Sequence, residues 1–234
     1  YYTFLLVGRD TGGGGNTDTI MVVSYDVKNQ ELNAMSIPRD TIVNKSWDIK
    51  KINSVYNYAG GGDKGMAALM DTVSDTIGFA PDFHIVVEWE AVGKLATAIG
   101  GVDFDVPVDM NYDAPTQDLH IHVVKGYQHL DGDKAMQVIR YRHDNMINGV
   151  MKGYLNGDLG RIETQQAFLK AVVEQCLQIQ NITRIGELAE VFNKNVTTNL
   201  SVNNLLWFGQ QAVLGNEKNG EPLDMDNVNF MTMP

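Results

Sequence analysis

Apolar residues follow two alternating patterns along the chain, and each pattern predicts one kind of element. Short apolar or alternating runs predict strands at 3–7, 19–25, 31–37, 83–87, 102–106, 119–124 and 228–233. Apolar residues three or four positions apart predict helices at 64–77, 90–99, 158–179, 184–193 and 202–214. Strands interleaved with helices favour an α/β fold, in which a mixed central sheet is covered by helices on both faces.

Turn and capping residues set several boundaries. Residues 27–30 form a hairpin turn between two of the predicted strands, and Gly78 supplies the C-terminal stop of the helix at 64–77. Asp131 is placed to cap a further helix that leads into Arg140. The chain contains no internal repeat, low-complexity tract or interdomain linker, so we expect residues 1–234 to form a single catalytic domain.

The composition of the chain excludes several classes of binding partner and structural feature. A formal net charge of -11 argues against nucleic acid as a partner, because the field of the whole molecule repels polyanions. The single cysteine, Cys176, excludes an internal disulfide, and its apolar neighbours predict a buried thiol. No stretch approaches the roughly 18 apolar residues of a membrane span. The sequence starts without Met, directly at an apolar strand, and we expect an N-terminal membrane anchor that this sequence lacks.

The arginines are few and concentrated. Four polar segments, at 8–19, 36–40, 140–142 and 158–165, contain all but one of the six. Forked guanidinium groups bind phosphate and carboxylate in a bidentate manner. A scattered set of ion pairs would give no reason for this concentration, so it favours a local anion site in an acidic protein.

Two carboxylates flank the glycine-rich loop of the first segment. Asp10 follows one predicted strand and Asp18 begins the next. If these strands are neighbours, the carboxylates converge on one hard cation, for which Mg²⁺ is suited because it takes one or two carboxylates together with phosphate oxygens. In the alternative, both aspartates merely cap turns. The glycine run lacks the lysine and hydroxyl residue that end a P-loop, so by itself it is a weak phosphate signal.

The other segments each admit two interpretations. Arg39 follows Pro38 at a strand end, where side chains commonly project into a site, but it could also form a surface salt bridge with Asp40. Arg140 and Arg142 share a face if the backbone there is extended and diverge if it is helical.

The last polar segment opens the long predicted helix. Arg161 and Gln165 lie on one face of its first turns, and Asp158 can cap its start. A helix N-terminus adds backbone N–H groups and a partial positive charge, which suit an anion.

The histidines are a weaker signal. His84, His120, His122 and His129 show no metal-ligand spacing beyond the alternating pair His120 and His122. We therefore expect no zinc site.

At these residues the chain resembles the LytR-CpsA-Psr family, whose members attach glycopolymers such as teichoic acids and capsules to peptidoglycan in Gram-positive envelopes. The resemblance covers roughly the first 180 residues. The matching motifs keep their order along the chain, and they are Phe4 to Gly8, Thr17 to Met21, Ser36 to Thr41, Lys51 to Asn53, Gly100 to Asp103, Val106 to Val108, His129 to Gly132, Tyr141 to His143 and Asp158 to Gln166.

The resemblance implies a sandwich fold that binds a polyprenyl pyrophosphate, with the lipid tail in an apolar pocket. It implies that Asp10 and Asp18 hold Mg²⁺ or Mn²⁺, and that Asp10, Asp18 and Arg39 are catalytic. It also implies six substrate-binding residues. Phosphates would be bound by Arg39, Arg140, Arg142 and Arg161, and accessory contacts would come from Lys51 and Gln165.

The implied reaction moves a phosphoryl-glycan from an undecaprenyl carrier to a sugar hydroxyl of peptidoglycan, at the extracellular face of the cytoplasmic membrane. Either Asp10 or Asp18 would accept the hydroxyl proton. A pyrophosphatase acting on the same donors and a non-catalytic polyprenyl-phosphate binder with a regulatory role remain alternatives. The loop departs from the family pattern, because Asn16 and Thr17 stand where an arginine and a serine are usual. Arg9 would compensate only if it faced the same side as Asp10.

Overall fold

The computed structural model describes residues 1–9, 16–146, 148–215 and 220–234. The chain divides into two compact units. Unit 1 comprises Tyr1–Glu88 and Val196–Pro234, and unit 2 comprises Trp89–Asn195. Each unit has its own hydrophobic core, and the two are described in turn.

Unit 1 is built on a mixed six-stranded sheet with the order β10-β3-β2-β1-β4-β9. Its central strands β1 to β3 pair antiparallel, whereas β4 runs parallel to β1 and β10 runs parallel to β3. The strands span Tyr2–Arg9 (β1), Thr17–Asp26 (β2), Glu31–Ser36 (β3), Phe83–Glu88 (β4), Val196–Thr198 (β9) and Val228–Thr232 (β10).

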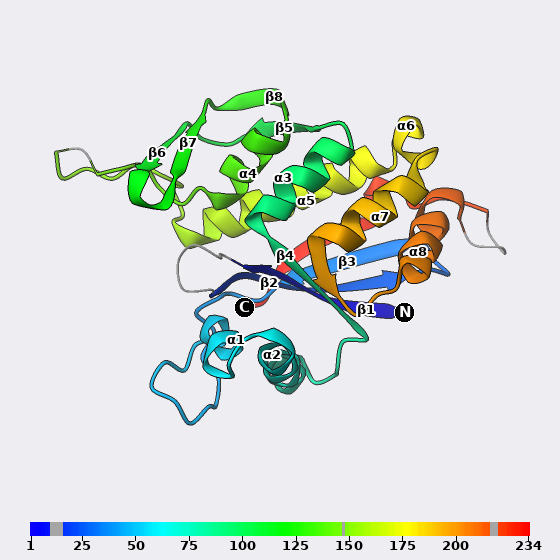
Figure 1. The fold of residues 1–234 in the computed structure, drawn as a ribbon, viewed down its shortest axis with the longest axis horizontal. Coiled ribbons are helices and arrows are strands. Elements are labelled where there is room, and N and C mark those ends of the chain that lie inside the picture. The colour runs from blue at the N-terminus through cyan, green and yellow to red at the C-terminus, as the bar shows by residue number, and fades with distance from the viewer. Residues whose placement is uncertain (10–15, 147, 216–219) are drawn as a thin grey trace. The chain divides into compact units, whose positions relative to one another are not determined.

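Helices cover both faces of this sheet (Figure 1). Leu5, Val7 and Val22 point to one face and pack with α2 (Gly62–Ile77), next to the short elements η1 (Ile52–Ser54) and α1 (Val55–Tyr58). Because side chains alternate along a strand, Tyr2, Phe4 and Tyr25 point to the other face. There they pack against Phe208 of α8 (Val202–Leu214). The expected mixed sheet with helices on both faces is confirmed.

Unit 2 combines helices with two antiparallel strand pairs, β5 with β8 and β6 with β7. Its core gathers the inward side chains of these strands with residues of α3, α4 and α5. The bounds are Trp89–Ala98 (α3), Val102–Val106 (β5), Met110–Ala114 (β6), Pro115–Gln117 (η2), Leu119–Val123 (β7), Gly126–Leu130 (β8), Gly132–Arg140 (α4), Asp158–Cys176 (α5), Ile179–Ile182 (α6) and Ile185–Asn195 (α7). A further single turn in unit 1, η3, spans Met225–Asn227.

The structure differs from the predicted elements at two places. Residues Met110–Ala114, for which no strand was predicted, form strand β6 because they pair with β7. The long helix expected to reach residue 179 ends at Cys176. Asn181 Nδ2 donates to the carbonyls of Gln175 and Ile99, both at 2.9 Å, and so holds the chain in a turn after α5.

Among the described residues, no helix combines the length and the apolar character that crossing a bilayer demands. Cys176 is a free thiol that lies partly buried against the core of unit 2. Burial raises the pKa of this thiol to about 11. The side chain is therefore a poor nucleophile in the folded protein.

Candidate functional site

In unit 1 the structure brings together Asp18 and Arg39. Arg39 Nη1 donates to Asp18 Oδ1 at 3.0 Å. The Asp18 side chain is 8% exposed and that of Arg39 is 25% exposed, so a nearly buried carboxylate holds a guanidinium that still reaches solvent. A carboxylate partner fixes the planar fork of an arginine in one orientation, which is what bidentate phosphate recognition requires.

Local irregularity at the end of the hairpin positions this pair. The register of β1 and β2 shifts between Gly8 and Arg9, so Asp18 lies at a bulge. Bulges commonly re-aim a side chain at the end of a ladder. The backbone N–H of Asn53 donates to the Arg39 carbonyl at 3.2 Å, and the Thr17 hydroxyl donates to the Asn53 carbonyl at 3.2 Å. The segment after β3 is thereby tied to the start of β2.

Lys51 lies close to the same segment but makes a different ion pair. Its Nζ is 3.0 Å from Asp40 Oδ1, and both side chains are about half exposed. The alternative in which Arg39 forms a surface salt bridge with Asp40 is therefore not the arrangement found. Asp40 pairs with Lys51, and Arg39 pairs with Asp18. Lys51 remains accessible for an accessory contact.

Arg9 packs against a tyrosine, a contact that the sequence did not suggest. Its guanidinium carbon lies 4.4 Å from the centre of the Tyr56 ring, and Nη1 donates to the Tyr56 hydroxyl at 3.3 Å. Nη1 also lies 3.5 Å from Glu88 Oε1. Because Arg9 and Tyr56 are 47 residues apart, no motif or spacing signals this contact. These contacts give Arg9 a cation–π partner and an ion pair of its own.

In unit 2, Arg140 is the last residue of α4 and Arg142 follows just beyond the helix. The intervening Tyr141 adopts an extended backbone, with φ -63° and ψ 137°. Its side chain is fully buried and donates to Asp144 Oδ1 at 2.8 Å. Burial, together with this carboxylate, raises the pKa of Tyr141. The buried tyrosine anchors the helix end from which both arginines extend.

Arg161 and Gln165 both lie buried on the first turns of α5. Arg161 Nη2 is 2.8 Å from Asp158 Oδ1, and the Arg161 side chain is only 4% exposed. Gln165 Nε2 donates at 3.5 Å to the carbonyl of Ile139, the residue that precedes Arg140 at the end of α4. The start of α5 is therefore linked to the end of α4. Asp158 acts as the ionic partner of Arg161, whereas the sequence suggested a helix cap.

The residues that could hold a metal ion are described only in part. Asp10 lies outside the described residues. Asp18 offers carboxylate oxygens at the start of β2, of which Oδ1 accepts from Arg39. An oxygen donor of this kind fits a hard cation such as Mg²⁺, which keeps several waters and takes further oxygens from phosphate.

The predicted site residues divide between the two units. Asp18, Arg39 and Lys51 belong to unit 1, whereas Arg140, Arg142, Arg161 and Gln165 belong to unit 2. The sixth arginine, Arg184, forms an exposed ion pair with Glu187 on α7 at 2.8 Å. Arg39 and Arg161 thus each pair with an aspartate, but Arg161 is buried whereas Arg39 is partly exposed, and Arg184 lies in an exposed pair with a glutamate.

Comparison with known proteins identifies the family. The sequence profile of the LytR_cpsA_psr family matches residues 1–232. The chain is 30% identical to a polyisoprenyl-teichoic acid–peptidoglycan teichoic acid transferase, TagV of Bacillus subtilis, over 82% of this chain and 46% of the relative. It is 33% identical to TagU of Bacillus anthracis, which bears the same description, over 85% of this chain and 60% of the relative. The chain therefore spans about half the length of these curated relatives.

Solved structures agree with this assignment. The crystal structure of B. subtilis TagV matches with a TM-score of 0.75 and 26% identity, over 100% of this chain and 84% of that one. A LytR-Csp2A-Psr enzyme from Actinomyces oris, at 20% identity, shares the fold with a TM-score of 0.75 over 100% of this chain and 81% of that one. The chain belongs to the LytR_cpsA_psr family.

Proposed function

We propose that this chain is a phosphotransferase of the cell envelope, which moves a glycopolymer of the teichoic acid type from a polyprenyl-pyrophosphate carrier to peptidoglycan. Membership of the family and the names of its relatives support this substrate class. The observation that carries the proposal is the contact of Arg39 with Asp18, a guanidinium held at 3.0 Å by a nearly buried carboxylate and still open to solvent.

The chemistry needs charge neutralisation more than covalent catalysis. A peptidoglycan hydroxyl oxygen forms a bond to the phosphorus that carries the glycan, and the bond from this phosphorus to the bridging oxygen breaks. Polyprenyl phosphate leaves with the electron pair, and a carboxylate of the chain accepts the hydroxyl proton. Arg39 would stabilise the negative charge that develops, because its orientation is fixed before the substrate binds.

We propose the remaining predicted residues as further phosphate contacts. Arg161 resembles Arg39 in its aspartate partner, and Arg140 and Arg142 extend from an anchored helix end. Mg²⁺ or Mn²⁺ held by Asp18, with Asp10 as the second carboxylate, would supply positive charge to the phosphate oxygens when bound. Asp10 or Asp18 would serve as the proton acceptor.

The test supplies a polyprenyl-pyrophosphate-linked teichoic-acid-type donor and peptidoglycan, and measures glycan that becomes covalently attached. Arg39→Ala should reduce the rate by about 100-fold or more, the usual cost of removing one donor to a developing oxyanion. Arg39→Lys should also be impaired, because it keeps the charge but loses the fork. Arg184→Ala is the matched control and should retain the wild-type rate. Equal rates for Arg39→Ala and Arg184→Ala would refute the assigned role.

The same assay separates the alternatives. A pyrophosphatase would release the glycan phosphate at the same rate with and without peptidoglycan. A non-catalytic binder would bind the donor without changing it, and in that case Asp18→Asn would have no turnover to abolish. Addition of a chelator, followed by Mg²⁺ or Mn²⁺, tests the metal: activity that is lost and then restored supports it, and full activity in the chelator contradicts it.

A further inference from the structure

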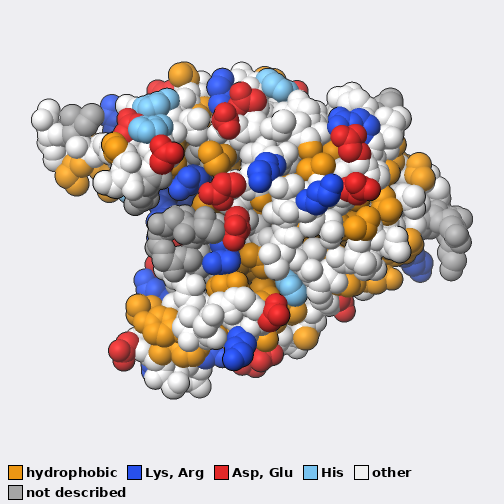
Figure 2. Space-filling view, viewed as in Figure 1, with side chains coloured by type: hydrophobic (Ala, Val, Ile, Leu, Met, Phe, Trp, Pro, Cys, Tyr) orange, Lys and Arg blue, Asp and Glu red, His pale blue; other side chains and the backbone are white. Residues whose placement is uncertain are grey.

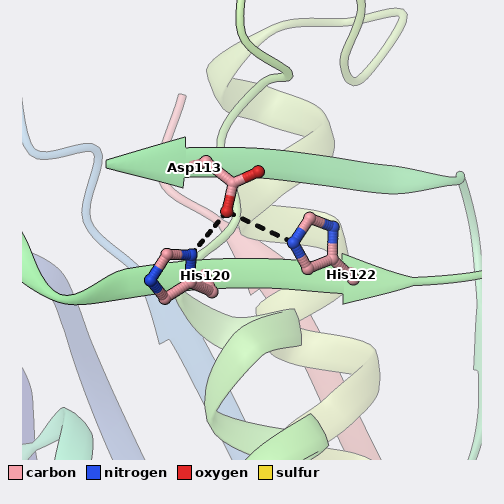
Figure 3. Close-up of side chains that lie close together, drawn as sticks. All are labelled: Asp113, His120 and His122. Atoms are coloured by element: carbon pink, nitrogen blue, oxygen red, sulfur yellow. Dashed lines mark hydrogen bonds and ion pairs between the residues drawn. The ribbon is translucent and has the colours of Figure 1, made fainter. Parts of the chain in front are cut away.

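A second cluster of chemically active side chains lies in unit 2, on the exposed face of the β6–β7 hairpin. Asp113 comes from β6, and His120 and His122 come from β7 (Figure 3). Figure 2 shows histidine side chains gathered on the surface over this hairpin. The strand register pairs Asp113 with His120 directly, and it pairs Asn111 with His122. Since side chains alternate along a strand, both imidazoles lie on the same face as the carboxylate.

The ligand atoms of this cluster lie close enough together to converge on one ion after small side-chain movements. Asp113 Oδ1 lies 2.6 Å from His120 Nδ1 and 3.2 Å from His122 Nε2. One ligand atom from each of the three residues lies within 4.8 Å of the other two. Zn–N bonds of about 2.0–2.1 Å place tetrahedral ligands about 3.3 Å apart. The side chains are about half exposed, so they are free to rotate into this geometry.

Hydrogen bonding orients His122 for a metal ion. Its Nδ1 lies 2.8 Å from Asn111 Oδ1, and its Nε2 faces Asp113 Oδ1. The imidazole can donate to both oxygens only as an imidazolium. As a neutral imidazole that donates from Nδ1 to Asn111, it presents the Nε2 lone pair toward the carboxylate, and a cation between them would satisfy both. Metal-binding histidines commonly donate their other ring nitrogen in this way.

The backbone under the cluster is held on both strands. The alternate side chains of β7 are buried in the core of unit 2, namely Leu119, Ile121 and Val123. The His122 backbone N–H donates to Gln137 Oε1 at 2.8 Å. The Asp113 N–H donates to Asn145 Oδ1 at 2.6 Å, and Asn145 Nδ2 donates to the Asp113 carbonyl at 2.9 Å. The ligands therefore project from a fixed scaffold, as a preorganised site requires.

We propose that Asp113, His120 and His122 form a binding site for a divalent transition-metal ion of the zinc class. Two imidazoles and one carboxylate suit Zn²⁺, whereas Mg²⁺ prefers oxygen ligands only. Three protein ligands leave further positions to water, and the bound ion links β6 to β7. This site shares no residue with the proposed phosphate site and is independent of the proposed transfer reaction.

The test is a calorimetric titration of the whole chain with ZnCl₂ in a buffer free of chelators, with MgCl₂ in parallel. We expect one equivalent of Zn²⁺ to bind and Mg²⁺ to give no comparable signal. His120→Asn and His122→Asn should each weaken Zn²⁺ binding more than tenfold. Asn111→Ala, which removes the orienting acceptor, should weaken it by about tenfold. These side chains are exposed, and circular dichroism checks that the variants fold.

His129 provides the matched control. It is equally exposed and pairs with Asp103 across β5 and β8, with Nδ1 2.8 Å from Oδ1, but it has one imidazole where the proposed site has two. His129→Asn should bind Zn²⁺ like the wild type. The proposal is overturned if the wild type binds no Zn²⁺, if His120→Asn and His122→Asn bind it as tightly as the wild type, or if His129→Asn weakens binding as much as they do.

Discussion

The ion pair of Asp18 and Arg39 should contribute a large coupling free energy to the stability of the protein. At 3.0 Å, Coulomb's law gives about 5.5 kcal/mol with an effective dielectric constant of 20 and about 1.4 kcal/mol in water. With the Asp18 side chain 8% exposed and that of Arg39 25% exposed, the pair lies between these limits, nearer to the protein interior. Allowing for the cost of desolvation, we expect a coupling free energy of about 2–3 kcal/mol.

A double-mutant cycle measures this coupling directly. It uses Asp18→Asn, Arg39→Gln and the double variant, with the free energy of unfolding taken from urea titrations followed by circular dichroism and tryptophan fluorescence. Both residues have further contacts, and the cycle cancels those that each single change removes independently. Each single variant should be less stable than the wild type, and the double variant should lose less than the sum of the two.

The pair of Arg184 and Glu187 is the matched control for this cycle. Its atoms are as close, at 2.8 Å, but its side chains are 44% and 59% exposed. Solvent and salt screen such pairs, so its coupling should not exceed the error of the measurement. Equal couplings for the two pairs would refute the view that Asp18 is a buried charge that depends on Arg39.

Three further predictions concern packing, capping and reactivity. Gly132→Ala should destabilise the protein by about 1–3 kcal/mol in urea unfolding, because a Cβ there would clash with the Gly93 carbonyl. Gly186 on α7 is exposed and a Cβ there meets nothing within 4 Å, so Gly186→Ala should stabilise the protein by about 0.5–1 kcal/mol. Equal effects of the two substitutions would contradict this reasoning. Asp131→Ala should cost about 1 kcal/mol in the same assay, since Asp131 accepts from Lys134 N at 2.9 Å, and Asp131→Asn should cost less. At pH 8, iodoacetamide should alkylate folded Cys176 far more slowly than the unfolded chain, because a pKa of about 11 leaves about one thiolate in a thousand, and equal rates would refute its burial.

The sequence predicted the elements whose apolar pattern is long and regular. The periodicity at 64–77 found α2, and the alternation at 102–106 found β5, because each element buries one face against a core. Strands β6, β8 and β9 were missed, since they are short and contain polar residues. Their order comes from pairing with a partner strand, which a single segment of sequence does not display.

The candidate site was predictable as a set of residues but not as a set of contacts. The concentration of arginines pointed to Arg39 and Arg161, whereas the partner of Arg39 is 21 residues away and depends on the register of β1 and β2. Asp113 escaped attention for the same reason, because it meets His120 only through hairpin pairing. The residue types in a segment indicate which chemistry it can perform, whereas the contacts between segments depend on the tertiary fold.

The central claim is that this chain joins a glycan phosphate to peptidoglycan. Incubation of the protein with a polyprenyl-pyrophosphate-linked donor and peptidoglycan, then enzymatic digestion and mass spectrometry of the muropeptides, tests it most directly. The account predicts muropeptides that carry the glycan through a phosphodiester, at levels that fall about 100-fold or more for Arg39→Ala and not for Arg184→Ala. Unmodified muropeptides, with the donor either intact or released as free glycan phosphate, would contradict it.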